Sequence, residues 1–228
     1  MEWIAVEVEG RVLRLWPDGG DEIRRTLEAG VTLASLIPEI EHTVSITADT
    51  HIIASGMCQE LCSGAVKPVP CRPPMARHLT PKTMEIDPRV TLVPPVMQEK
   101  PIGVMHHEVS RIAGLIAQEP DFDGVACLVG ENTVWAHISA EEIVSFQSAA
   151  SGRMMGALCG ATLCVGNGFD GAASDMMSRP QGLSARLASP QAALDLGRMS
   201  EADLLSHMSG LLVGVELASM RPYWLGPR

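Results

Sequence analysis

The sequence predicts a mixed α/β protein with two lobes, because a pattern of three strands occurs twice and the C-terminal third is rich in helix-forming residues. The first copy of the pattern occupies residues 3–28 and the second occupies residues 124–147. In each copy, apolar segments of strand length are separated by turns that contain glycine or polar residues. A repeat of this size, about 120 residues apart, indicates that each lobe begins with a three-stranded meander.

The first copy predicts a hairpin followed by a third strand. Glu9-Gly10 separates the first two strands, and the sequence Pro-Asp-Gly-Gly at residues 17–20 ends the second, because glycine and proline are strong turn formers. A further short strand is expected before Ser55-Gly56. The expected strands are residues 3–8, 11–16, 21–28 and 51–54.

A proline-rich segment follows from Lys67 to Pro101, with eight of the 16 prolines before Pro101 itself. This density excludes long helices and favours extended chain with edge strands that crosses between the lobes. Residues 107–118 are then expected to form a helix, because apolar residues recur there at helical spacing.

The second copy predicts strands at residues 124–129, 133–138 and 142–147, with a tight turn at Gly130-Glu131-Asn132 and a helix starting near Ser148. Shorter helices are expected at residues 170–179, 180–187 and 190–196. Ser200 with Asp203 resembles the N-cap of a longer helix at residues 201–220. Gly210 and Gly214 within it indicate close backbone packing, which we expect to be against a sheet.

Composition narrows the classes of function. Seventeen basic and 27 acidic residues give a net charge of −10, which disfavours nucleic acid and anionic membranes as partners. The sequence starts Met1-Glu2-Trp3 without a basic leader, and no apolar run reaches membrane-spanning length. These features predict a cytoplasmic protein. The six cysteines form no Cys-x-x-Cys pair and are expected to be reduced.

Residues 121–152 read DFDGVACLVGENTVWAHISAEEIVSFQSAASG. This stretch resembles the 2-dehydro-3-deoxygalactonokinase family, which comprises sugar-acid kinases of the actin/hexokinase-like (ribonuclease H-like) superfamily, and the resemblance extends with gaps from Trp3 to about Met220. It implies a two-lobed actin/hexokinase-like fold with lobes at residues 1–100 and 101–228. The C-terminal lobe is expected to be truncated, because the sequence stops at Arg228 before a strand-and-helix segment that completes the adenine pocket of the family.

The resemblance also implies a reaction, in which ATP with Mg²⁺ phosphorylates a 2-keto-3-deoxy sugar acid. A small sugar-acid ligand is therefore the expected partner, and a homodimer is left open. By resemblance, Glu7 would be the metal ligand and Glu108 the catalytic carboxylate. The residues implied for ATP are Gly10, Gly130, Asn132 and Thr133, and those implied for the sugar acid are Gly30, Val31, Gly56 and Met57.

Several positions depart from the phosphate-binding turns of the family. In the first turn, Glu9 stands in place of glycine, and Gly10 and Arg11 stand in place of hydroxyl residues. In the second turn, Glu131 replaces threonine, Asn132 replaces histidine and Val134 replaces lysine. Each added carboxylate would repel a phosphate charge at about 4 Å by about 4 kcal/mol at an effective dielectric constant near 20.

These departures leave more than one function open. The first is a kinase of the family with weak or lost activity, which would need no cofactor if activity is lost. The second is a non-catalytic descendant that senses a ligand or binds a partner. A third, a metal hydrolase using His106, His107 and Glu108, is weakened because neighbouring side chains on a helix point in different directions. Arg153 replaces a glutamate of the family and could attract a carboxylate ligand.

Overall fold

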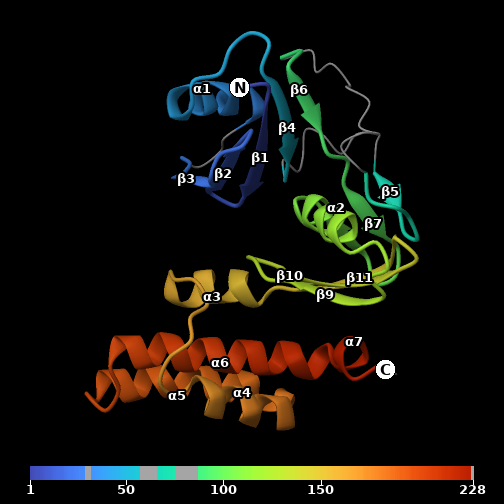
Figure 1. Ribbon diagram of the computed structural model, residues 1–228. Helices are drawn as coiled ribbons and strands as arrows, with labels where there is room; N and C mark the ends of the chain where they lie inside the picture. Colours follow the sequence, from blue (N-terminus) through green and yellow to red (C-terminus); the bar gives the residue numbers. More distant parts are fainter. Residues whose placement is uncertain (29–31, 57–65, 75–86, 227–228) are drawn as a thin grey trace. The chain divides into compact units, whose positions relative to one another are not determined.

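The computed structural model in Figure 1 describes residues 1–28, 32–56, 66–74 and 87–226. The chain divides into two compact units, one formed by residues 1–126 with 136–146 and the other by residues 127–135 with 147–228. Each unit has a hydrophobic core of its own. The lobe boundary expected at residue 100 remains a prediction.

A five-stranded sheet with the order β3-β2-β1-β4-β6 forms the framework of the first unit. The central strand β1 is antiparallel to β2 and parallel to β4. Four of the five strands lie where the sequence predicts them, and the fifth, β6, lies in the proline-rich segment. The strands are β1 (Trp3–Glu9), β2 (Val12–Pro17), β3 (Ile23–Thr26), β4 (His51–Ser55) and β6 (Val90–Leu92).

One face of this sheet is apolar and packs in a core with helix α1 (Leu33–Thr43). Ile4 and Leu15 from the sheet and Ile40 from the helix are fully buried there. Thr32 caps the helix in a capping box with Ser35. No helix was expected at α1, and Pro38 lies in its interior, a position that is normally unfavourable for a helix.

The opposite face of the sheet carries a row of polar residues. Alternate residues of a strand point to opposite faces, so the partners of Glu7 in the register share its face. Glu7 pairs with Ser55 of β4 and with Arg14 of β2, and Arg14 pairs in turn with Arg24 of β3. A row of polar side chains therefore crosses four strands.

The proline-rich segment forms short strands, as its composition predicts. Strands β5 (Lys67–Pro68), β7 (Val96–Gln98) and β8 (Gly103–Met105) make a small sheet with the order β5-β7-β8. The side chain of Gln98 accepts a hydrogen bond from the backbone N–H of Phe146 (2.9 Å) and donates one to its carbonyl oxygen (2.8 Å). Helix α2 (Glu108–Gln118) follows and buries Val109, Ile112 and Ile116.

The second meander has the predicted strands β9 (Gly124–Leu128), β10 (Thr133–Ser139) and β11 (Glu142–Ala149) in the order β11-β10-β9. Ala140 and Glu141 alone connect β10 to β11, and a connection this short joins antiparallel strands. Both residues have positive φ angles, 51° and 62°, as a two-residue hairpin turn of type I′ requires.

Helices form most of the second unit. They are α3 (Ser151–Cys159), α4 (Phe169–Ser178), the 3₁₀-helix η2 (Pro180–Gly182), α5 (Leu183–Asp195), α6 (Glu201–Ser219) and α7 (Arg221–Trp224). The predicted cap of α6 is present, with the Ser200 hydroxyl accepting a hydrogen bond from the Asp203 N–H (3.1 Å). Residues 183–195 form one helix instead of the two pieces expected, because Pro190 removes only one hydrogen-bond donor from it.

The glycines of α6 do allow close packing, but against a helix and not against a sheet as predicted. A Cβ atom at Gly210 would overlap the carbonyl oxygen of Phe169, and one at Gly214 would overlap that of Ala173. Both partners belong to α4, which lies alongside α6 (Figure 1). Across the part of the chain that the structure describes, no helix combines the length and apolar character needed to cross a membrane.

Candidate functional site

The polar face of the first unit carries a buried group of charged side chains. Glu7 and Glu9 are alternate residues of β1 and therefore point to the same face; they are only 3% and 8% exposed. His107 and Arg111 are four residues apart at the start of α2, so they share one face of that helix. Together with Arg14 of β2, these residues form what we call the Glu7–Glu9 cluster.

Two guanidinium groups hold the Glu7 carboxylate. Arg14 Nη1 and Arg111 Nη2 each donate to Glu7 Oε1 at 2.5 Å, and Arg111 Nε donates to Glu7 Oε2 at 3.1 Å. Arg111 thus contacts both carboxylate oxygens, which is the two-point geometry in which arginine pairs are strongest. The contact joins residues 104 positions apart in the chain.

Glu9 is held by the same arginines and faces the imidazole. Arg14 Nη1 lies 2.8 Å from Glu9 Oε2, and Arg111 Nη2 lies 3.9 Å from it. His107 Nε2 lies 3.9 Å from Glu9 Oε1. Burial alone would lower the pKa of Arg14, but its hydrogen bond to Glu9 and the charges of Glu7 and Glu9 outweigh burial and raise that pKa above the usual value. Arg14 therefore stays charged.

Glu108, the carboxylate expected to be catalytic, is buried at the first turn of α2. Its Oε2 accepts a hydrogen bond from the backbone N–H of His106 (2.9 Å), and its Oε1 lies 3.5 Å from His107 Nε2. Burial lowers the pKa of the His106 imidazole, which keeps it neutral near pH 7. Glu108 thus stabilises the start of the helix beside the Glu7–Glu9 cluster.

Two glycines expected in binding roles lie next to this cluster. Gly10 has a φ angle of 56° and forms the turn after β1. Gly56 has a φ angle of 89°, and a Cβ atom there would overlap the carbonyl oxygen of Val8, between Glu7 and Glu9. Only glycine fits both constraints at position 56. Gly30, Val31 and Met57, the other residues expected to bind the sugar acid, lie outside the described residues.

The second turn, with Gly130, Asn132 and Thr133, belongs to the second unit. Glu131 is exposed there, whereas Thr133 and Val134 are 2% and 1% exposed. The start of α3 supports this turn: a Cβ atom at Gly152 would overlap the carbonyl oxygen of Gly130, and the Arg153 N–H donates to the Glu131 carbonyl oxygen (2.8 Å). The Arg153 side chain is exposed.

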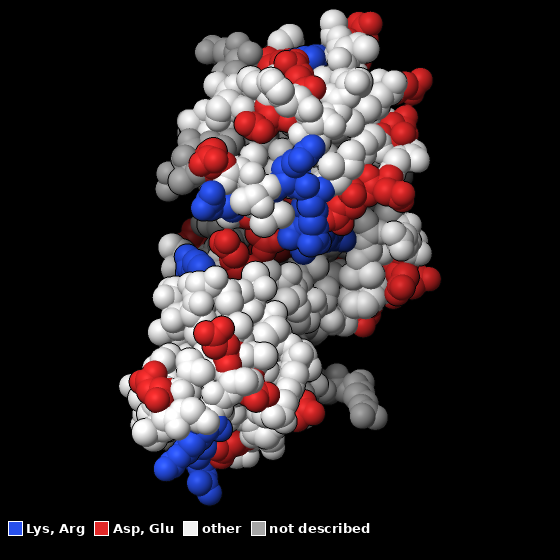
Figure 2. Space-filling view, turned by 90° about the vertical axis from the view of Figure 1, so that its left-hand side faces the viewer, with Lys and Arg blue, Asp and Glu red and all other residues white. Residues whose placement is uncertain are grey.

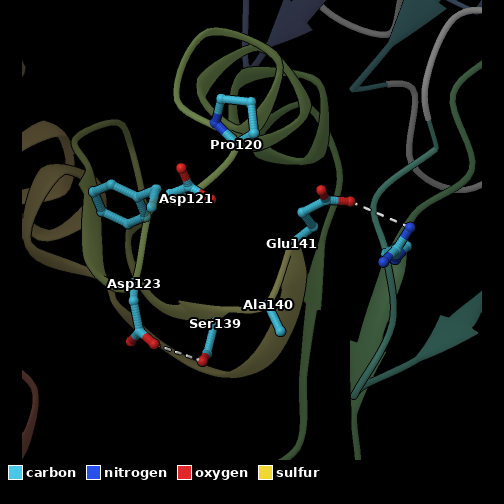
Figure 3. A pocket seen from close by; sticks show the side chains of 8 residues that line it. Pro120, Asp121, Asp123, Ser139, Ala140 and Glu141 are labelled. Carbon is cyan, nitrogen blue, oxygen red and sulfur yellow. Dashed lines mark hydrogen bonds and ion pairs between the residues drawn. The ribbon is translucent and has the colours of Figure 1, made fainter.

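A separate hollow of about 450 Å³ lies around the β10–β11 turn in the first unit. In Figure 3 the Ser139 hydroxyl is directed at the Asp123 carboxylate, to which it donates a hydrogen bond of 2.9 Å. The second dashed line joins Glu141 to an arginine; this is the ion pair with Arg72, at 3.2 Å. Asp121 and Asp123 are exposed, so water can solvate them. None of the residues expected in the site lines this hollow.

On the face shown in Figure 2, basic side chains form small groups that border acidic ones, and large areas carry no charge. The Glu7–Glu9 cluster therefore remains the main candidate, since it is buried, charged and built from three separate elements of the first unit.

Sequence reasoning identified the cluster only in part. It singled out Glu7, but it treated Glu9 only as a departure and Arg14 only as part of the framework. Two signals were present in the sequence. Glu7 and Glu9 are two residues apart along β1, and His107 and Arg111 are four residues apart. Neither signal indicates that β1 and α2 face each other.

Comparisons with known proteins agree over most of the chain. Residues 18–228 match the model of the family described as 2-keto-3-deoxy-galactonokinase. The chain is 23% identical to the 2-dehydro-3-deoxygalactonokinase of Escherichia coli (strain K12) over 239 residues, which covers 97% of this chain and 81% of that protein.

One solved structure shows the same fold. A crystal structure of a candidate 2-dehydro-3-deoxygalactonokinase protein from Sinorhizobium meliloti superposes with a TM-score of 0.80 at 21% identity, covering 96% of this chain and 81% of that one. The Aquifex aeolicus member of the Ppx/GppA family reaches a TM-score of only 0.30 at 10% identity, with 97% of this chain and 90% of that one covered. That value is too low to support an inference.

Proposed function

Because the chain belongs to the 2-keto-3-deoxy-galactonokinase family, we propose that it derives from an ATP-dependent kinase of a 2-keto-3-deoxy sugar acid and that its own phosphoryl transfer is weak or lost. The observation that carries the proposal is the pairing within the Glu7–Glu9 cluster. Arg14 and Arg111 already donate to Glu7 and Glu9 beside the first turn, and Arg11 in the turn itself donates to the carbonyl oxygen of Leu27. A phosphate would have to compete with these two carboxylates.

The triphosphate of ATP does not fit the side chains of this first turn. Phosphate-binding turns present backbone N–H groups, hydroxyls and cations to the ligand. Here Glu9 is buried on the strand that leads into the turn, and the resemblance places glycine at that position in the family. One unit-charge repulsion at about 4 Å costs about 4 kcal/mol at an effective dielectric constant near 20, which is enough to abolish most binding.

The second turn supports the same conclusion. Val134 stands where the family has a lysine, and it is only 1% exposed, so it contributes to packing and offers no charge. Glu131 is exposed at the position of a threonine. A donor and a cation are therefore replaced by an acceptor and an apolar side chain. In this proposal the two turns still contain the residues expected to bind nucleotide, namely Gly10, Gly130, Asn132 and Thr133. They lack the donor and the cation that would attract phosphate.

A second candidate function is binding of the sugar acid without phosphorylation, as in a ligand-sensing or partner-binding descendant. Gly56 favours it, because this residue retains a backbone conformation that only glycine adopts easily and contacts β1 directly. In this proposal Gly30, Val31, Gly56 and Met57 contact the sugar acid, and Glu108 serves to start α2. In this proposal the lobes are residues 1–100 and 101–228, and each contains one meander.

Calorimetric titration with Mg-ATP, with and without 2-keto-3-deoxy-galactonate, tests the proposal. We expect ATP to bind with a Kd above about 1 mM and a coupled kinase assay to stay at background. Glu9→Gln removes one carboxylate and releases one partner of Arg14, so ATP affinity should rise about tenfold. Glu39→Gln, a neutralisation of an exposed residue of α1, should leave affinity unchanged. Clear ATP-dependent phosphorylation by the unmodified chain would refute the proposal.

A further inference from the structure

We propose that Cys159 and Cys164 form a reversible intramolecular disulfide, so that the end of helix α3 is a site of oxidative modification. Cys159 is the last residue of α3, and Cys164 lies in the loop that leads to α4 (Figure 1). Both thiols are free in the structure, and both belong to the second unit. The inference goes beyond the proposed function, because it holds whether or not phosphoryl transfer is retained.

The loop after α3 returns to the core on which the helix packs. Gly160 ends α3 with a φ angle of 63°, the left-handed conformation in which many helices end and the chain changes direction. Leu163 then packs against the same hydrophobic cluster as Cys159, a cluster that includes Met155 of α3. Residues on both sides of the turn therefore lie on one core.

Ser209 of α6 fixes the position of Cys164. The buried Ser209 hydroxyl accepts a hydrogen bond from the Cys164 backbone N–H (3.0 Å) and lies 3.8 Å from Cys164 Sγ. The same hydroxyl lies 3.9 Å from Met155 Sδ. Met155 and Cys159 are four residues apart on α3, so they share one face of that helix. One serine thus holds Cys164 beside the helix face that carries Cys159.

The two thiols also act on each other electrostatically. The pKa of Cys159 is raised, first because neighbouring atoms partly desolvate the thiol and then by the charge of Cys164. A charge shifts the pKa of another group mainly over a few ångströms, which agrees with the contacts through Ser209. Once Cys164 is joined to another sulfur it carries no charge, so its contribution to the pKa shift disappears and Cys159 ionises more easily.

The loop has room to close. A disulfide needs two Cα atoms about 4.4–6.8 Å apart, and the four residues between the cysteines allow this approach. Thr162 is exposed, and no atom lies within 4 Å of a Cβ placed at Gly160. The loop can therefore adjust without disturbing the core.

Exposure assigns the order of the two steps. Cys164 is exposed, whereas Cys159 is partly buried, so a small-molecule disulfide such as oxidised glutathione reaches Cys164 first. The Cys164 thiolate attacks one sulfur of the oxidant, forms a mixed disulfide and expels one glutathione thiolate. The Cys159 thiolate then attacks the Cys164 sulfur and expels the second glutathione thiolate. The protons of the two protein thiols pass to the two glutathione thiolates, so one oxidised glutathione is reduced to two glutathione molecules.

Peptide mapping tests the pairing directly. Arg153 precedes both cysteines, and no Lys or Arg lies between it and Arg179, so trypsin releases the two cysteines in one peptide that contains no other. The folded full chain is incubated with oxidised glutathione, free thiols are alkylated, and the mass of the peptide is measured. We expect a peptide that is lighter by two hydrogen atoms and carries no alkyl group. Treatment with a reducing agent should restore two thiols that can be alkylated.

Single variants separate the roles of the two thiols. In Cys159→Ser, Cys164 should retain glutathione as a mixed disulfide, because the thiol that would displace it is absent. In Cys164→Ser, Cys159 should react with the oxidant at least about tenfold more slowly than Cys164 does in the unmodified chain. Cys127→Ser is the matched control, because Cys127 is exposed in the same unit, and it should leave the oxidised peptide unchanged. Circular dichroism confirms that each variant is folded.

The same reaction in urea shows whether the fold brings the thiols together. In the folded chain, Ser209 already orders Cys164 and α3 already orders Cys159, so less conformational freedom is lost when the disulfide closes. In one glutathione buffer, the ratio of disulfide to dithiol should therefore be at least about tenfold higher in the folded chain than in the unfolded chain.

Four results would each overturn the inference: glutathione that stays on Cys164 of the unmodified chain, two thiols that both remain open to alkylation, a disulfide from either residue to another cysteine, or an equal ratio in urea. None of these experiments contains nucleotide or sugar acid. Failure here therefore leaves the proposed loss of kinase activity untouched, and an active kinase would leave this thiol pair untouched.

Discussion

Replacing Trp135 with Phe should destabilise the second unit through a single buried hydrogen bond. The indole Nε1 of Trp135 donates to Glu216 Oε1 at 2.8 Å, and the two residues are 8% and 7% exposed. The other carboxylate oxygen, Glu216 Oε2, is buried and has no hydrogen-bond partner among the described residues. Phe would therefore leave the whole carboxylate without a protein donor.

The expected magnitude follows from this geometry. A hydrogen bond to a charged group contributes about 1.5–3 kcal/mol, and a buried group left unpaired loses that amount. We expect Trp135→Phe to lower the free energy of unfolding by about 2–3 kcal/mol. The double variant Trp135→Phe with Glu216→Leu removes both polar partners, and such paired replacement is close to neutral. The double variant should therefore recover at least about 1 kcal/mol of the free energy of unfolding that Trp135→Phe loses.

Urea unfolding followed by circular dichroism measures these changes, since dichroism does not depend on the fluorescence of the altered tryptophan. With Glu216→Leu as the remaining corner, the double-mutant cycle should give a coupling energy of about 1–2 kcal/mol. Additivity within about 0.5 kcal/mol would refute the reasoning, because it would mean that the two side chains do not act as a pair.

The Cys127 thiol gives an independent readout. This residue reaches the surface, but its pKa is raised to about 11, first because neighbouring atoms partly desolvate the thiol and then by the charge of Glu216. Removing that charge in Glu216→Leu should lower the pKa of Cys127, so that alkylation of this thiol begins at a lower pH. An unchanged alkylation profile at Cys127 would show that the Glu216 charge does not act on it.

Two further predictions concern packing and pH. Gly214→Ala should destabilise the chain by about 1–3 kcal/mol, because the new Cβ would overlap the Ala173 carbonyl oxygen and lie 2.8 Å from Met176 Cβ. The control Gly171→Ala, which has open space around the new Cβ, should stabilise the chain by up to about 1 kcal/mol. Equal melting temperatures of the two variants would contradict this prediction. The pKa of Asp87 is lowered mainly by its hydrogen bond to Arg89, so the stability from this pair should be complete above about pH 4, the unfolded pKa, and lost as the pH falls through the folded pKa. Asp87→Asn should flatten that part of the acid-unfolding curve, and an unchanged curve would exclude Asp87 as its source.

Local patterns in the sequence determined most of the strands and the longest helix. In both meanders, apolar segments bounded by Gly10 and by Gly130 predict strands whose observed bounds differ by a few residues at most. Ser200 with Asp203 likewise places the start of α6. These features depend on neighbours within a few positions, where propensity and turn chemistry act directly.

Tertiary packing overrode the local pattern elsewhere. Pro38 argues against a helix, yet α1 forms and buries Leu36 and Ile40 against the first sheet. Pro190 suggests a helix start, yet α5 runs through it. Gly210 and Gly214 indicate close packing, but the partner proved to be α4. Burial of an apolar face outweighs the loss of one hydrogen-bond donor.

The candidate site was decided almost entirely by tertiary structure. The sequence shows that Glu7 and Glu9 share a face of one strand and that His107 and Arg111 share a face of one helix. It does not show that Arg111 contacts Glu7, because those residues are 104 positions apart. Such a contact depends on how the helix is placed over the sheet, and no local pattern encodes that placement.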